Sequence, residues 1–232
     1  MGERWFDDAE LARMSVPTMD LVIAAIDEGR LDEARALAER MKSEWVMLHD
    51  LFVDMTAGLV TYVQQREGDD GVARAWEECF ERGWRPHVEK IARLDRRRVV
   101  ELLAATWRAH STSGAGRFPG RFSISEDDEK FTFSMHPCGS GQRLVLRGGY
   151  EGDRAFGRTE EAHDWSYGRA GFPLYCTHCT FMNELLPLRW IGYALYPSHP
   201  PGDYEQDPCV WYWYKDPAAI PAEYRDRYET ID

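Results

Sequence analysis

The segment Phe131–Cys138, FTFSMHPC, decides how the second half of the chain is expected to fold. Its apolar and polar side chains alternate, which is typical of a half-buried β-strand. Successive strand side chains point to opposite faces, so Phe133 and Met135 are expected to face a core. His136 and Cys138 are expected to leave the strand together on the other face, immediately before a glycine turn.

A second cysteine group, CTHC at residues 176–179, has the spacing of a metal site. Two thiolates three residues apart can bind one tetrahedral metal, and thiolate with imidazole is a usual zinc ligand set. With His136 and Cys138, the pattern is H-x-C followed, after 37 intervening residues, by C-x2-C. We therefore predict a metal site that holds zinc, with iron as the alternative.

The sequence leaves the last ligand of this site open. The candidate ligands are Cys138, Cys176, Cys179, His136, His178 and Cys209. His178 is the weakest, because at roughly 100° of helix rotation per residue it points about 200° away from Cys176. Four thiolates would give a closed structural site, whereas three protein ligands and a water would give an open catalytic one.

The turn Pro137–Gly141 resembles the P-C-G-S-G core of the zinc knuckle at the C-terminus of the bacterial preprotein translocation motor. In that family a cysteine precedes the turn and two further ligands follow within a few residues. Here His136 holds the earlier position, and the following LVLR at 144–147 contains no ligand. The resemblance implies metal binding at Cys138, but neither that family's function nor its compact fold.

Over most of its length the chain also resembles, loosely, the bacterial L-2-amino-thiazoline-4-carboxylic acid hydrolases and their relatives. Cys138, Cys176 and the CVWY segment at 209–212 would occupy the matching places, while Cys179 and His136 depart from that pattern. This resemblance implies hydrolysis of a cyclic C–N bond in a small molecule.

Composition limits the kind of partner. The 232 residues carry a net charge of −12, which argues against nucleic acid, because phosphate binding needs a basic surface. No signal peptide begins the sequence, and no apolar run approaches the roughly 20 residues of a membrane span. Five cysteines, an odd number, indicate a reducing compartment. We expect a cytoplasmic, bacterial-type protein without a membrane partner, and the sequence leaves its oligomeric state open.

Periodicity predicts an α+β fold with a helical bundle at 1–115 and an antiparallel region with one inserted helix at 116–232. We expect the second region to hold the metal site and the two regions to pack as one unit. A hinge is expected at 111–120. Helices are expected at 19–28, 31–67, from 69, after Asp95, and at 177–186 with Pro187 as the stop. Strands are expected at 122–125, 131–138, 144–147, 190–196 and 209–215. Cys79 is expected in the core.

The long helix carries His49, Asp50 and Asp54 within an apolar stripe. A buried carboxylate needs a partner, so this face is either the solvated side of the helix or one wall of a pocket that faces the cysteines. In the second interpretation Asp50, His49 or His163 is the general base. The expected pocket residues are Asp54, Trp165, Asn183, Trp211 and Trp213.

Together these features predict a zinc-dependent enzyme that hydrolyses a C–N bond of a small molecule. Two alternatives stay open. One is a non-catalytic protein with a structural zinc site and a helical surface that binds a partner. The other is a thiol redox protein that uses its C-x2-C pair.

The purified protein is predicted to carry about one equivalent of zinc, because thiolate and imidazole ligands favour this ion. Mass spectrometry under native conditions measures the bound metal. A folded, metal-free protein whose thiols at this site are all free would contradict the prediction.

Overall fold

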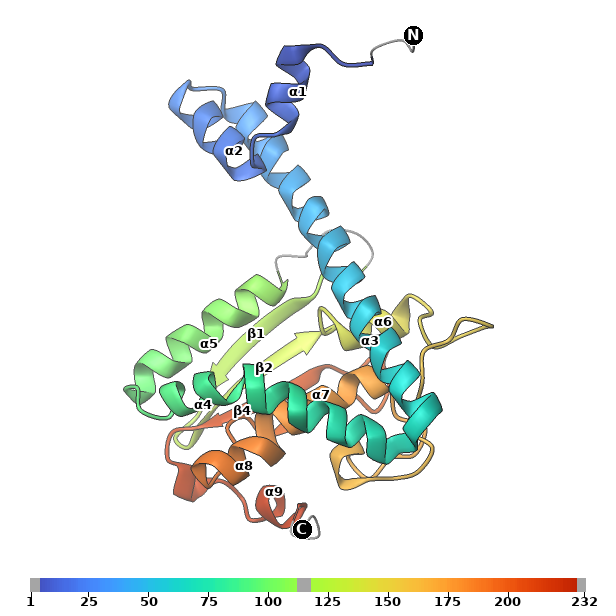
Figure 1. Cartoon of the computed structure of the whole chain (residues 1–232). Helices are drawn as coiled ribbons and strands as arrows, with labels where there is room; N and C mark the ends of the chain where they lie inside the picture. Colours follow the sequence, from blue (N-terminus) through green and yellow to red (C-terminus); the bar gives the residue numbers. More distant parts are fainter. Residues whose placement is uncertain (1–4, 112–117, 229–232) are drawn as a thin grey trace. The chain divides into compact units, whose positions relative to one another are not determined.

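The computed structural model describes residues 5–111 and 118–228 of the chain (Figure 1). The chain forms two compact units, Met1–Leu48 and His49–Asp232. The boundary expected near residue 115 therefore lies inside the second unit, where helices and sheet share their cores. The central part of the expected hinge, 112–117, lies outside the described residues.

The first unit is a small helical assembly. It holds α1 (Asp8–Met14), α2 (Thr18–Asp27) and the beginning of α3 (Leu31–Gly83). Asp7 and Glu10 form a capping box at the start of α1. Four small or aliphatic side chains make its core: Val22, Ala25, Ala34 and Leu37. The helices expected at 19–28 and from residue 31 are therefore present.

Helix α3 is broken where the sequence indicates. Gly68 has a φ of 68° and a ψ of −169°, which is outside helical geometry. Glycine reaches such a positive φ without steric cost. The chain then continues as α4 (Arg85–Ile91) and α5 (Arg96–Ser111), and the Asp95 carboxylate accepts a hydrogen bond of 3.2 Å from the Arg98 amide. Cys79 is exposed, so its expected place in the core is wrong.

By length and composition, α3 could cross a membrane. One 18-residue window qualifies, and 17% of it is buried. The sequence holds no uninterrupted apolar run of this length, because Asp50 and Asp54 lie between the apolar residues of α3. One such helix is weak evidence, since a helix of a soluble protein can pass the same test.

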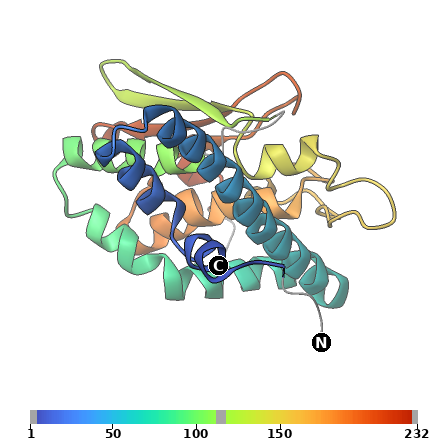
Figure 2. The same ribbon diagram turned by 90° about the horizontal axis from the view of Figure 1, so that it is seen from above.

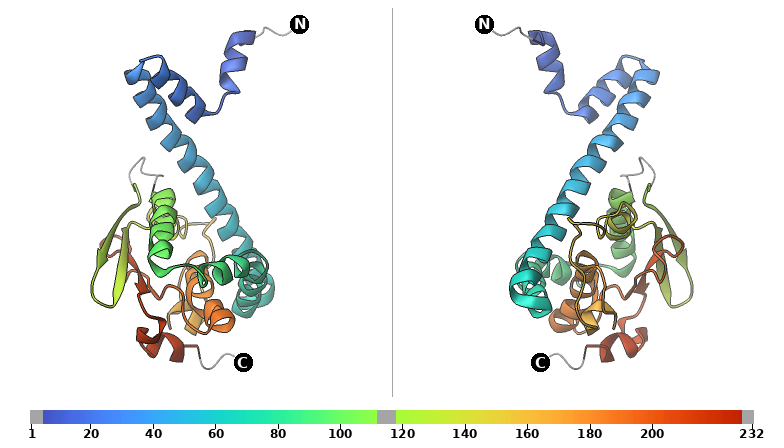
Figure 3. Two further views of the ribbon diagram at one scale, coloured as in Figure 1. Left: turned by 90° about the vertical axis from the view of Figure 1, so that its left-hand side faces the viewer. Right: turned by 90° about the vertical axis from the view of Figure 1, so that its right-hand side faces the viewer.

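A four-stranded antiparallel sheet confirms the α+β fold class. Its order is β1 (Arg121–Glu126), β2 (Lys130–His136), β4 (Cys209–Tyr214) and β3 (Ser198–His199). In the register, Phe133 lies opposite Trp211, and Met135 lies opposite Cys209. These side chains and Trp213 pack with residues of α4 and α5 in the largest core. Figures 2 and 3 show the helices of this unit on one side of the sheet.

Two expected strands are helical or irregular. Residues 144–146 belong to α6 (Gly141–Leu146), and Arg147 follows it directly. The segment 190–196 starts inside α8 (Leu186–Ile191) and continues beyond the end of that helix. Short apolar runs do not distinguish a strand from a buried helix. The expected strand 131–138 ends at His136, because Pro137 lacks the N–H that a ladder needs. His136 is therefore exposed and Cys138 is buried, rather than both sharing a strand face.

The inserted helical segment is longer and less regular than expected. It runs through the 3-10 turn η2 (Leu174–Thr177), α7 (His178–Thr180), the π-helical turn η3 (Phe181–Leu185) and α8. Pro187 does not stop it but lies in the first turn of α8, where a proline is tolerated. The remaining short elements are η1 (Asp164–Ser166), η4 (Pro217–Ala219) and α9 (Glu223–Asp226).

A buried carboxylate fastens this segment to the rest of the second unit. Glu184 is fully buried and accepts hydrogen bonds from the Ser198 amide at 2.8 Å, the Ser198 hydroxyl at 2.6 Å and the Tyr228 hydroxyl at 2.9 Å. Its second oxygen also lies 3.0 Å from Nη1 of Arg227. One side chain therefore joins η3, β3 and the C-terminal segment.

Glu184→Ala is predicted to lower the free energy of unfolding by about 3–5 kcal/mol. The substitution removes the carboxylate from a buried ion pair and leaves Arg227, Ser198 and Tyr228 without their acceptor. Urea unfolding followed by circular dichroism measures the change. Glu205→Ala, at an exposed carboxylate, is the control and should change stability by less than about 0.5 kcal/mol. Equal stability of the two variants would show that Glu184 is not a structural tie.

Candidate functional site

Four of the five cysteines line one small cavity of about 30 Å³ in the second unit. They are Cys138, Cys176, Cys179 and Cys209. The strand register brings two of them together, because β4 begins at Cys209, opposite Met135 and close to the turn that carries Cys138. Gly141 admits a third, since a Cβ at that position would lie 2.5 Å from Cys176 Sγ.

Cys138 is the cavity cysteine whose ionised form the structure stabilises most. The Cys209 thiol donates a hydrogen bond to its sulfur, and this bond lowers the pKa of Cys138 well below the ordinary value. Burial acts in the opposite direction, but His110 and the backbone N–H of Ser140 add further stabilisation of the anion. Hydrogen bonds to the charged form outweigh desolvation here.

The neighbouring cysteines are held as thiols. Burial raises the pKa of Cys176 and of Cys179, and the Cys138 anion raises both further. The pKa of Cys209 is raised first by its hydrogen bond to Cys138 and then by burial. The surroundings therefore favour ionisation of Cys138 over that of the other three cysteines.

Within residues 5–111 and 118–228, no group of three or more His, Cys, Asp or Glu side chains is placed to hold a metal ion. His136 is turned away from the cavity, with its Nδ1 3.2 Å from the Asp207 carbonyl and 3.2 Å from Nε2 of Gln142. Zinc binding by these residues stays a prediction.

His178, the weakest ligand candidate, lies beside the thiols. Its Nδ1 donates to the Tyr175 carbonyl, which leaves Nε2 as an acceptor 3.5 Å from Cys179 Sγ. Burial lowers the pKa of this imidazole, so it is neutral. The expectation that it points away from the cysteines assumed one regular helix, whereas Cys176 lies in a 3-10 turn and His178 begins α7.

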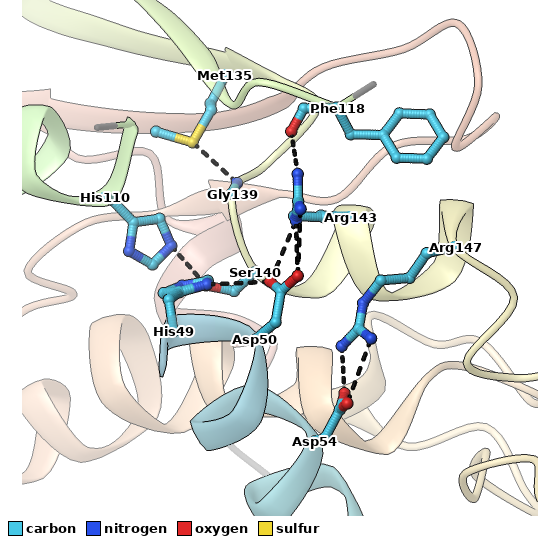
Figure 4. A network of polar contacts seen from close by, with 10 residues as sticks. All are labelled: His49, Asp50, Asp54, His110, Phe118, Met135, Gly139, Ser140, Arg143 and Arg147. Carbon is cyan, nitrogen blue, oxygen red and sulfur yellow. Dashed lines mark hydrogen bonds and ion pairs between the residues drawn. The ribbon is translucent and has the colours of Figure 1, made fainter. Parts of the chain in front are cut away.

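A polar network connects α3, α5 and the Cys138 turn (Figure 4). Ser140 Oγ lies 2.8 Å from His110 Nε2 and 3.0 Å from His49 Nε2. His49 Nδ1 in turn lies 3.4 Å from Asp50 Oδ1. Burial, and next the neighbouring His110, lower the pKa of His49. The His49 and His110 rings thus both contact the Ser140 hydroxyl, and Ser140 lies two residues after Cys138.

The carboxylates of the α3 face have partners, as expected, and the partners are arginines of α6 and the residue after it. Arg143 Nε and Nη2 each lie 3.1 Å from an Asp50 oxygen. Arg147 Nη1 lies 3.2 Å from Asp54 Oδ2. Burial opposes ionisation of Asp50, but the Arg143 guanidinium outweighs it, so the pKa of Asp50 is lowered. Asp50 therefore orients the turn and the His49 ring, and is poorly suited to act as a base.

A larger pocket of about 310 Å³ opens on the other side of the Cys138 turn. Its polar lining groups include His110, Ser140, His178 and Asn183, and Cys138 and Cys179 supply sulfur. Its apolar walls are formed by Trp84, Ile91, Leu102, Leu103, Trp107, Met182, Tyr196 and Trp211. The expectation of a pocket that Asn183 and Trp211 line agrees with this cavity.

Other expected site residues lie elsewhere. His163 Nε2 is 2.8 Å from Asp69 Oδ2, and its ring stacks on Trp165 with centroids 4.4 Å apart. Trp213 is buried beneath the Arg96 guanidinium, whose carbon is 3.6 Å from the ring centroid. His163, Trp165 and Trp213 are therefore not among the residues that line the Cys138 pocket. Conversely, His110 was not expected at the site, because no motif connects it to a cysteine 28 residues further on.

Comparison with known protein families, curated proteins and solved structures finds no match to this chain. Its function is therefore inferred from the geometry of the site.

Cys209→Ala is predicted to raise the pKa of Cys138, because it removes the largest stabilising hydrogen bond. A hydrogen bond to a charged group contributes about 1.5–3 kcal/mol, which corresponds to roughly one to two pH units. The pH dependence of iodoacetamide alkylation at Cys138, followed by peptide mass spectrometry, measures this value.

Cys209→Ser is the matched control, since its hydroxyl can still donate to the thiolate and should preserve most of the effect. If the alanine and serine variants titrate alike, Cys209 does not stabilise the Cys138 anion. Because the folded pKa lies below that of the unfolded chain, the thiolate also stabilises the fold at high pH. This contribution is lost as the pH falls through the folded pKa.

Proposed function

We propose that this protein is a thiol-dependent hydrolase of a small, largely apolar molecule, with Cys138 as the nucleophile. The observation that carries the proposal is the position of Cys138 in the wall of an aromatic-lined pocket, beside two imidazoles and with a lowered pKa. A thiolate with an adjacent base is the usual arrangement for covalent catalysis by cysteine.

The pocket indicates the substrate class. A volume of about 310 Å³ is near the lower end of small-molecule sites. Tryptophan and leucine side chains form much of its wall, and two of its polar groups, Ser140 and His110, lie beside Cys138. This distribution favours a substrate with an apolar body and one polar, electrophilic group that points toward the turn.

The residues at the turn support a two-step reaction. The Cys138 sulfur attacks an electrophilic carbon of the substrate and forms a C–S bond, while the C–N bond breaks. The departing amine takes a proton from the His110 ring, which acts as the general acid in this step. Water then attacks the same carbon and gives a proton to His110, which restores the Cys138 thiolate and releases the acid. Ser140, bonded to both imidazoles, positions His110.

The choice of a C–N bond rests on the resemblance to thiazoline carboxylic acid hydrolases, which implies a cyclic C–N bond. A soft thiolate suits attack on a carbon of this kind. This proposal keeps the reaction expected from the sequence and replaces zinc-activated water with a cysteine nucleophile.

A thiol–disulfide activity is the second candidate, favoured by the direct hydrogen bond between the Cys138 and Cys209 sulfurs. The pair would be Cys138 and Cys209 rather than the C-x2-C cysteines, because burial keeps Cys176 and Cys179 protonated. Such a pair would reduce a small disulfide such as oxidised glutathione with a transient protein disulfide as the product.

The hydrolase proposal predicts that p-nitrophenyl acetate acylates Cys138, with a burst of about one equivalent of p-nitrophenol followed by slower turnover. Cys138→Ala should abolish the burst. Cys79→Ser, which removes an exposed cysteine, is the control and should retain it. His110→Gln should slow turnover by on the order of 10²–10⁴-fold through loss of acid–base catalysis.

Two results would contradict the proposal. One is a burst that survives in Cys138→Ala. The other is an activity that a chelator removes and added zinc restores, which would favour the zinc-dependent alternative. Reduction of oxidised glutathione without ester turnover would favour the thiol–disulfide alternative.

A further inference from the structure

Helix α3 exposes a row of large apolar side chains in the second unit. The exposed fractions are 57% for Phe52, 52% for Met55, 63% for Leu59 and 54% for Tyr62. These residues are separated by three, four and three positions. On the opposite side of the same helix, Val53, Ala57 and Val60 are buried in the cores of the unit.

The spacing is that of a coiled-coil seam. The alternation of three and four residues is that of the a and d positions of a heptad repeat. The row therefore occupies four consecutive a and d positions. Apolar residues at this period bring two helices together along their whole length.

We propose that this row, the α3 seam, is the surface through which two copies of the chain form a homodimer. A seam with one repeat is self-complementary, because each copy presents the same knobs and holes to the other. Two-fold dimers with such an isologous interface are the commonest oligomers.

The size of the seam matches a weak, reversible dimer. Large side chains present on the order of 200 Å² each, so these four and the flanking Leu51, each about half exposed, offer roughly 500 Å² per copy. Transient interfaces bury less than about 1,200 Å² in total, or about 600 Å² on each partner.

The charge pattern favours a second copy over an unrelated charged partner. The e and g positions beside the seam in the second unit are His49, Leu51, Thr56, Gly58, Val63 and Gln65. None is an acidic residue, lysine or arginine. Two copies of a chain with a net charge of −12 can therefore meet here without like charges opposite each other.

A membrane fits the same residues less well. Asp50 and Asp54 lie within the apolar stretch and are paired with Arg143 and Arg147, which keeps the helix within the folded unit. In a spanning helix these charged side chains would lie in the hydrocarbon core, where they are costly. A helix lying on a membrane surface carries lysine and arginine beside its apolar face, and none flanks the seam from 49 to 65.

Sedimentation velocity and light scattering of the full chain, from about 1 to 100 μM, test the proposal. We expect a dimer for the native protein, and a monomer for Leu59→Glu and for Phe52→Glu. Ile124→Glu is the matched control, because Ile124 is an equally apolar residue on β1 with an exposed fraction of 41%. It should remain a dimer, and circular dichroism should show that all three variants are folded.

Three outcomes would overturn the proposal. The first is a native protein that is monomeric throughout this range, as expected if the seam is covered within one chain. The second is a dimer that Leu59→Glu and Phe52→Glu leave intact. The third is a folded monomer that co-floats with vesicles of mixed neutral and anionic lipid, which would assign the seam to a membrane.

Discussion

The antiparallel pairing of β2 with β4 is the constraint on which the site depends. Its register sets Met135 opposite Cys209 and Phe133 opposite Trp211. One face of the sheet is therefore apolar, and the Met135–Cys209 pair lies at the end of this face. A shift by one residue would turn these side chains to the other face. The packing of α4 and α5 against the apolar face fixes the register and thereby brings the Cys209 thiol to Cys138.

Low polarity around that end of the sheet makes the cysteines unequal. Burial penalises every thiolate, and an unassisted thiol therefore stays protonated. Cys138 alone among the four cavity cysteines combines a donating thiol, a backbone N–H and a nearby imidazole. Once it is ionised, its charge raises the pKa of the other three. This competition favours one ionised sulfur, and the proposed role of Cys138 as the nucleophile rests on it.

The arginines that follow the Cys138 turn explain how the helical and sheet parts share one site. Arg143 and Arg147 reach the carboxylates of α3, and the same helix supplies His49 to Ser140. A pair of this kind contributes to positioning more than to net stability, because desolvation offsets much of its attraction. The acidic α3 face thus serves as a support for the turn.

The sequence by itself determined the fold class, the strands β1, β2 and β4, the break at Gly68 and the Asp95 cap, because alternation, glycine and capping chemistry act locally. It also singled out Cys138 and the C-x2-C pair. Only the tertiary structure decided that residues 144–147 are helical and that Cys79 is exposed. It alone placed His110 beside Cys138 and left His136 and His163 outside the pocket. These outcomes depend on packing and on hydrogen bonds between residues far apart in the chain, which no local pattern encodes.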